Sequence, residues 1–112
     1  MSKTPIAVRA AIVALPFLAA AAEAQEFGNP MRGRAFAAQL CSDCHQTEPG
    51  DNRSPDPGAP PFTAVAKTKG MTAMALGVWL QTSHPTMPNI KLKPDTTDDI
   101  IAYILSLRPR PQ

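Results

Sequence analysis

Two thiols and an imidazole stand close together in the run Cys41-Ser42-Asp43-Cys44-His45. In a helical segment, Cys44 follows Cys41 by three positions and His45 follows it by four, so the three side chains share one face. Thiols so placed can bond to the two vinyl groups along one edge of a porphyrin, with the imidazole under the iron. Cys-x-x-Cys-His is the attachment signature of a c-type haem, and the chain has no further cysteine. We therefore predict one covalent haem c, with His45 as the proximal iron ligand.

A second source of ligands is the segment Ser83-His84-Pro85-Thr86-Met87-Pro88-Asn89. Its two prolines are incompatible with a helix interior and favour a stiff loop. A thioether on such a loop is presented to a metal at low entropic cost. Histidine with methionine is the ligand pair of electron-transfer haem proteins with raised reduction potentials. We predict Met87 as the second axial ligand.

Three other residues compete with Met87 for this assignment. An imidazole ligand from His84 would give a bis-histidine haem of low potential; otherwise His84 is expected to be a solvent-facing loop residue. Met71 stands at the start of a predicted helix and Met74 within it, where methionine usually fills core space.

Helical segments are expected to position these residues, at about 31–43, for one or two turns from 62, at 72–82 and at 95–108. Thr72 is expected to cap the third segment, and Thr96 and Asp99 have the spacing of a capping box. Residues 46–61 are rich in proline and glycine and are expected to form a loop. The expected buried stripes, at helical spacing, are Phe36 and Leu40; Leu76, Trp79 and Leu80; and Ile100, Tyr103, Ile104 and Leu107. No convincing strand follows the first 24 residues, so the predicted class is all-α with three to four helices.

The order of these parts resembles the small single-haem bacterial cytochromes c of class I, with His/Met ligation. The resemblance covers about Gly33 to Leu107 and includes a last helix like Asp99–Ile104. It implies the small cytochrome c fold, whose helices wrap around one covalent haem. In that fold the first and last helices cross at the position of Gly33, although this residue is equally compatible with an ordinary helix start.

The resemblance also assigns roles to two other residues. Pro60-Pro61-Phe62 is similar to the family's Gly-Pro-x-Leu segment, although Ala59 and Phe62 depart from that pattern. It implies that the carbonyl of Pro60 accepts a hydrogen bond from the second ring nitrogen of His45, as ligating histidines require; Pro61 is the alternative acceptor, and a plain turn is another. Trp79 is interpreted either as a contact at the haem edge or as a core residue.

The first 24 residues read as a secretory signal peptide. Lys3 and Arg9 precede a short apolar run at 10–22, and Ala22-Glu23-Ala24 fits a cleavage site. The prediction is a domain at 25–112, exported to the periplasm and without stable membrane insertion. An uncleaved anchor is the alternative, although the run is shorter than the roughly 20 apolar residues of a spanning helix.

The predicted function is that of a one-electron carrier, not an enzyme, which passes electrons between a donor and an acceptor redox protein through brief contacts. A haem subunit of a larger periplasmic dehydrogenase or oxidase is an alternative. The net charge of +2 gives no sign of a nucleic-acid binder. Lys91 and Lys93 are interpreted as steering an acidic partner or as an ordinary solvated loop.

The same residues are compatible with three further roles. A thiol–disulfide oxidoreductase would use Cys41 and Cys44 but needs an alternating β-α pattern. A haem peroxidase or ligand sensor would need Met87 to be absent or labile. A zinc site would combine both cysteines with His45 and His84.

Overall fold

The computed structural model describes residues 27–110, and the predicted signal peptide at 1–24 lies outside these residues. Within them the chain forms α1 (Pro30–Leu40), α2 (Phe62–Lys67), α3 (Ala73–Gln81) and α4 (Pro94–Ser106). The only β-type pairing among these residues is an isolated bridge between His84 and Met87. The predicted all-α class is therefore confirmed. None of these helices has the length and apolar character that a membrane span requires.

Helix α1 begins and ends through local hydrogen bonds. The side chain of Asn29 accepts from the backbone N–H groups of Met31 and Arg32, which would otherwise lack partners at the helix start. The hydroxyl of Ser42 donates to the carbonyl of Ala38 at 2.5 Å. Ser42 thereby bonds through its side chain to a carbonyl that its amide would use in a longer helix. The predicted extension of this helix to Asp43 is wrong, since it ends at Leu40.

Helix α4 begins earlier than its acidic residues indicate, because Pro94 stands at its first position. The preceding residue, Lys93, is the N-cap and makes no side-chain capping bond. The predicted capping box of Thr96 and Asp99 is therefore wrong. Asp99 is instead buried, and its carboxylate accepts from the backbone N–H of Asn29 at 2.6 Å.

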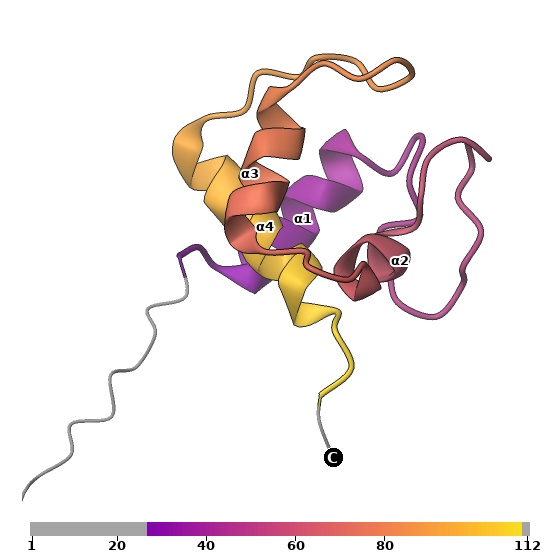
Figure 1. Cartoon of the computed structure of the whole chain (residues 1–112), viewed down its shortest axis with the longest axis horizontal. Helices are drawn as coiled ribbons and strands as arrows, with labels where there is room; N and C mark the ends of the chain where they lie inside the picture. Colours follow the sequence, from indigo (N-terminus) through magenta and orange to yellow (C-terminus); the bar gives the residue numbers. More distant parts are fainter. Residues whose placement is uncertain (1–26, 111–112) are drawn as a thin grey trace, which may run out of the picture.

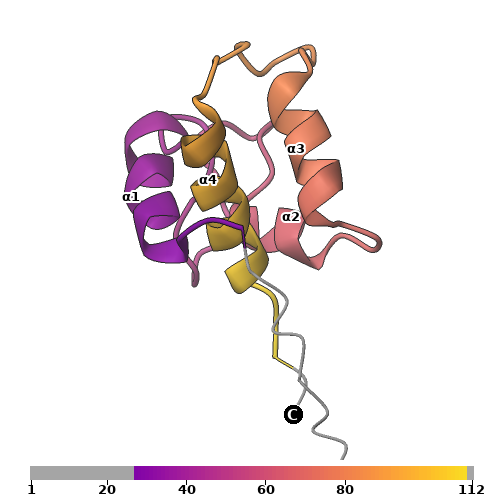
Figure 2. The same cartoon turned by 90° about the vertical axis from the view of Figure 1, so that its left-hand side faces the viewer.

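Helices α1 and α4 pack side by side at a glycine, and α4 lies between α1 and α3 (Figures 1 and 2). A Cβ atom at Gly33 would overlap the backbone carbonyl of Asp99 and would lie 2.8 Å from the Cβ of Tyr103. Gly33 therefore permits the close helix crossing that the family resemblance implied, and it is not merely a helix-start glycine. The core around this contact combines Ala37 and Phe62 with Ala66, Leu76, Ile100, Ile101, Tyr103 and Ile104.

Helix α3 buries one face, and within residues 27–110 its other face stays exposed. Thr72 caps it as predicted, accepting from the N–H of Ala75 at 3.1 Å, and Leu76 is only 3% exposed. The prediction that Trp79 belongs to the buried stripe is wrong, because its side chain is 55% exposed. Leu40 of the first predicted stripe is likewise exposed. In both cases the spacing was helical, but no other element of residues 27–110 packs over these side chains.

Candidate functional site

The cysteine motif forms a compact turn directly after α1. The amides of Cys44 and His45 both donate to the carbonyl of Cys41, at 3.2 and 2.8 Å. The second of these bonds closes a single α-helical turn, so the three side chains keep the spacing that the sequence predicted although the helix has ended. Both thiols are free and half-buried.

The environment of Cys41 disfavours thiolate chemistry. Burial raises the pKa of the Cys41 thiol from its ordinary value of 9.0 to about 11. Thiol–disulfide exchange requires a thiolate, and reactive cysteines have lowered pKa values. Residues 27–110 also contain no β-α alternation around the motif. Both observations weigh against the oxidoreductase alternative.

The imidazole of His45 is held by one backbone carbonyl. Its Nδ1 lies 2.7 Å from the oxygen of Pro60. A carbonyl only accepts, so Nδ1 must carry the proton, and Nε2 of a neutral ring then presents a lone pair. The ring of Phe62 contacts the imidazole with 5.4 Å between centroids. This is the arrangement in which a histidine is oriented for a metal.

Helix α2 decides which of the two prolines serves as the acceptor. The carbonyl of Pro61 accepts from the amides of Ala64 and Val65, at 2.9 and 3.0 Å, and so begins α2. The carbonyl of Pro60 lies outside the helix and remains available to His45. Of the two acceptors that the sequence left open, Pro61 is used by the helix and Pro60 makes the contact with His45.

The loop between α2 and the motif is tied to the site at both ends. The amide of Phe62 donates to the carbonyl of Gln46 at 2.9 Å, and the amide of Asp56 donates to that of Cys44 at 3.1 Å. The hydroxyl of Tyr103 in α4 donates to the carbonyl of Thr47 at 2.7 Å, and that bond is buried. The proline-rich loop is therefore fixed against the cysteine motif and the core.

The second group of candidate ligands lies in the segment that connects α3 to α4, which arches away from the helices in Figure 1. The amide of Met87 donates to the carbonyl of His84 at 3.1 Å, which closes a tight turn. Nδ1 of His84 lies 2.8 Å from the carbonyl oxygen of Thr82, and its Nε2 lies 3.1 Å from Sδ of Met87. Trp79 contacts the same imidazole edge to face at 5.1 Å. The prediction of a solvent-facing His84 is wrong, since the residue is half-buried in these contacts.

The site residues predicted from the sequence therefore fall into two groups. Cys41, Cys44 and His45 join Pro60, whereas Met87 and Trp79 are joined through His84. The hydrogen bonds and ring contacts of residues 27–110 do not link one group directly to the other. The competing methionines differ from Met87 in environment: Met71 packs against the core, and Met74 is 82% exposed.

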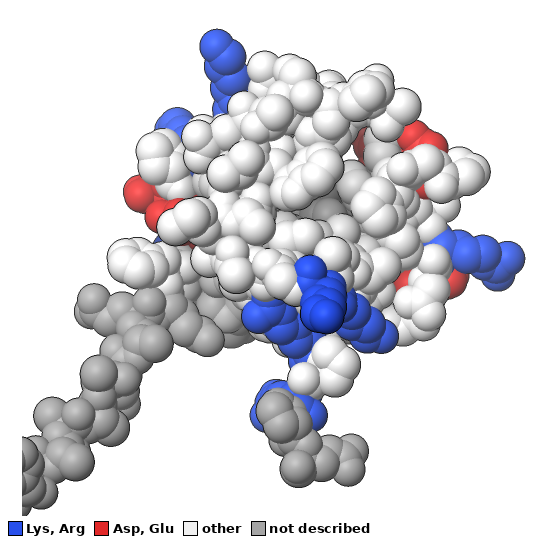
Figure 3. Space-filling model, viewed as in Figure 1, with Lys and Arg blue, Asp and Glu red and all other residues white. Residues whose placement is uncertain are grey.

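The residues fit a c-type haem by their chemistry. Two unpaired thiols stand three positions apart, and the next residue is an imidazole with a backbone partner on Nδ1. An apolar strip of α3, formed by Met74, Val78 and Trp79, is exposed on the protein surface, as a large apolar cofactor would require of its contacts. Figure 3 shows a broad uncharged area with a hollow near its centre, Lys and Arg gathered below it, and other charged side chains at the rim of the view.

A zinc site is not formed by the same residues. Among residues 27–110, no three His, Cys, Asp or Glu side chains come together in a way that could hold a metal ion. The zinc alternative required four such side chains from the cysteine motif and His84. It is therefore contradicted by the geometry.

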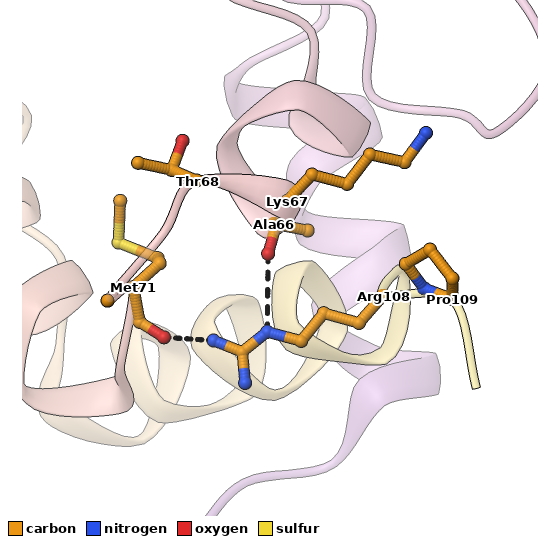
Figure 4. Close-up of a pocket in the computed structure, with 7 residues that line it drawn as sticks. Ala66, Lys67, Thr68, Met71, Arg108 and Pro109 are labelled. Carbon is orange, nitrogen blue, oxygen red and sulfur yellow. Dashed lines mark hydrogen bonds between the residues drawn. The ribbon is translucent and has the colours of Figure 1, made fainter. Parts of the chain in front are cut away.

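A pocket elsewhere on the surface has a structural role (Figure 4). The guanidinium of Arg108 donates to the carbonyl of Ala66 at 3.2 Å and to that of Met71. These bonds tie the end of α4 to the C-terminal turn of α2, where a cation is favourable. The pocket contains none of the predicted site residues. The sequence indicated Arg108 only as a helix-end residue and held no signal for its two long-range partners.

A curated relative supports the resemblance seen in the sequence. Cytochrome c-552 of Bradyrhizobium diazoefficiens is 34% identical to this chain over 77 residues, which cover 69% of this chain and 73% of the relative. No protein-family model matches the chain. No solved structure matches it either.

Proposed function

The chain belongs to the small bacterial cytochromes c, which are haem-containing electron carriers, and on that premise we propose that it is a periplasmic one-electron carrier with His/Met ligation. One haem c would be bonded to Cys41 and Cys44. The haem supplies the redox chemistry when bound. The chain supplies two axial ligands, a water-poor surrounding and an accessible edge.

The observation that carries this proposal is the state of His45. Its Nδ1 lies 2.7 Å from the carbonyl oxygen of Pro60, so the lone pair of Nε2 is available on the residue that directly follows the second cysteine. The hydrogen bond fixes both the tautomer and the plane of the ring. His45 therefore serves as the proximal ligand and Pro60 as its positioning partner.

The second axial position is assigned to Met87. The turn of residues 84–87 holds its thioether, half-buried, against an imidazole. A thioether opposite a histidine raises the reduction potential, because it favours the reduced metal. With both axial positions taken by protein groups, small molecules have no open position, and this argues for electron transfer rather than for a peroxidase or sensor.

Trp79 is proposed as a contact of the haem. Trp79 is the single tryptophan of the chain, and it is 55% exposed. Among the described residues its ring contacts the ring of His84. An apolar ring of this size loses hydrophobic free energy when it is left in water. A bound haem would cover it, together with the exposed side chains of Met74 and Val78.

Charge distribution indicates the kind of redox partner. Between Pro57 and Pro94 the chain contains four lysines and no Asp or Glu. This stretch holds α2, α3 and the Met87 turn, so the second ligand group has no acidic neighbour along the chain. Complementary charge speeds encounters, and we propose brief contacts with a donor and an acceptor of acidic surface. A fixed place in a larger dehydrogenase or oxidase complex would use the same face.

Export to the periplasm is proposed from residues 1–24, which resemble a cleavable signal peptide. The mass of the protein recovered from a periplasmic extract tests both the export proposal and the proposed covalent attachment of haem. We expect the chain from residue 25 plus one haem, with the haem retained after denaturation. A product with the mass of the bare polypeptide, from a host able to attach haem, would contradict covalent binding.

The ligand assignments are tested by optical spectra of purified variants. The wild-type protein should have the weak far-red band that sulfur-to-iron bonding produces, and Met87→Ala should lose it and lower the potential. His45→Ala should fail to yield a low-spin holoprotein, whereas His84→Ala should retain the far-red band. A normal low-spin product from His45→Ala would refute the proximal assignment.

A further inference from the structure

We propose that His84 is a latent axial ligand, which takes the second iron position when the Met87 thioether is absent. This inference rests on the function proposed above and adds a residue to its ligand set. The turn at residues 84–87 would then provide two possible iron ligands, His84 and Met87, instead of one.

The first argument is that His84 is oriented in the same way as His45. Nδ1 of His84 lies 2.8 Å from the carbonyl oxygen of Thr82, and Nδ1 of His45 lies 2.7 Å from that of Pro60. Each carbonyl can only accept, so each Nδ1 carries the proton and each neutral ring presents the lone pair of Nε2. A backbone partner of this kind is what metal-ligating histidines normally have. The chain has two histidines, and both are prepared in this way.

The second argument is the position of the free nitrogen. Nε2 of His84 lies 3.1 Å from Sδ of Met87. An imidazole nitrogen and a thioether sulfur are both ligand atoms for haem iron. They are two candidate ligands directed into the same space from one turn, which the bond from the Met87 amide to the His84 carbonyl closes at 3.1 Å.

The third argument is that the ring of His84 is held in place. Trp79 contacts it edge to face with centroids 5.1 Å apart, and the residue is half-buried. Little side-chain entropy remains to be lost when this imidazole binds a metal. Met74, in contrast, is 82% exposed on α3 and has no such support. His84 is therefore the replacement ligand that the structure favours.

The test uses haem-loaded full-length protein in three forms: Met87→Ala, the double variant Met87→Ala/His84→Ala, and the matched control Met87→Ala/Met31→Ala. Met31 is 82% exposed on α1 and lies outside the proposed haem contacts. Electron paramagnetic resonance and absorption spectra report the ligands, and the rate of carbon monoxide binding to the reduced protein reports an open position. We expect Met87→Ala and the matched control to be low-spin with two imidazole ligands. The variant that lacks both Met87 and His84 should be high-spin and bind carbon monoxide at least about tenfold faster, on the order of 1.4 kcal/mol in the barrier.

The possible failures are distinguishable. If Met87→Ala alone is high-spin and binds carbon monoxide as fast as the double variant, the latent ligand is refuted and His/Met ligation stands. If the wild-type protein already has two imidazole ligands and no far-red band, the proposed His/Met function fails instead. To exclude misfolding as the cause of a high-spin spectrum, circular dichroism of each variant should match that of the wild type. Met87→Ala/His84→Gln, which keeps a polar side chain of similar reach, should also be high-spin, because an amide is a poor ligand for haem iron.

Discussion

Gly33 of α1 lies directly against the backbone carbonyl of Asp99 in α4, with no room for a Cβ atom between them. The two helices that frame the cysteine motif therefore touch at the level of their backbones. The packing of Tyr103 depends on this contact. The hydroxyl of Tyr103 in turn fixes Thr47, which follows the cysteine motif.

The substitution Gly33→Ala is expected to destabilise the holoprotein by about 1–3 kcal/mol, because the added methyl must push α1 away from α4. Denaturant unfolding followed by circular dichroism measures this change. Gly77→Ala is the matched control, since the nearest atom to its new methyl would be Cδ1 of Ile101 at 3.9 Å. This control should be neutral or stabilising by up to about 1 kcal/mol through helix propensity. Equal effects of the two substitutions would contradict a close crossing at Gly33.

The ion pair between Asp99 and Arg32 is expected to make stability depend on acidic pH. Arg32 donates to both carboxylate oxygens, at 2.7 and 2.9 Å. These bonds, with smaller help from the amide of Asn29, lower the pKa of the Asp99 carboxyl below its ordinary value of 3.8, although burial opposes the shift. A lowered folded-state pKa contributes stability that is present above the unfolded value and is lost as pH falls through the folded value.

We therefore expect the unfolding free energy of the wild type to fall below about pH 4 more steeply than that of Asp99→Asn. At pH 7 the variant should be the less stable protein, since the buried side chain loses its charge-assisted bonds. Urea titrations at pH 7 and pH 3 measure both differences. Asp43→Asn, at an exposed position in the cysteine motif, is the control and should follow the wild type at both pH values. A variant Asp99→Asn with the same pH dependence as the wild type would refute this role of the pair.

Removal of the Tyr103 hydroxyl is expected to leave the carbonyl of Thr47 without its buried partner. The bond is 2.7 Å long and joins α4 to the loop after the haem-attachment motif. Tyr103→Phe should cost about 1–3 kcal/mol, the usual penalty for an unsatisfied buried acceptor. Thermal unfolding of the holoprotein measures the loss. Ser106→Ala, at an exposed residue of the same helix, removes a hydroxyl whose hydrogen bond to the carbonyl of Tyr103 is local, and it should change stability by no more than about 0.5 kcal/mol.

The contact between Pro60 and His45 is expected to influence the reduction potential. Pro60→Ala keeps a carbonyl at position 60 but releases the φ angle that the ring fixes, so the bond to Nδ1 becomes looser. A weaker bond makes the imidazole a poorer electron donor, and the potential should rise. Stability should fall by up to about 1 kcal/mol through the greater freedom of the unfolded chain. Spectroelectrochemistry checks the first effect; Pro57→Ala, an exposed proline in the same loop, should leave the potential unchanged.

Several parts of the site followed from local chemistry and could be predicted. The spacing of the cysteine motif needs only one helical turn, and that turn forms even though α1 ends before it. Thr72 caps α3 because a side-chain oxygen at that position reaches a free amide three residues later. The contact of the Pro60 carbonyl with His45 is not local in this sense, because the two residues are 15 positions apart, and only the family resemblance implied it.

The sequence by itself determined the helical class, the turn that presents Cys41 and Cys44, and the loop that carries Met87, because each depends on residues within a few positions of one another. Tertiary structure alone decided the choice of Pro60 over Pro61, the exposure of Trp79 and the contact of His84 with Met87. It also decided that Asp99 pairs with Arg32 across a helix crossing instead of capping its own helix. These outcomes depend on which distant segments bond to a given carbonyl or cover a given helix face. The spacing of residues along the chain does not predict such contacts.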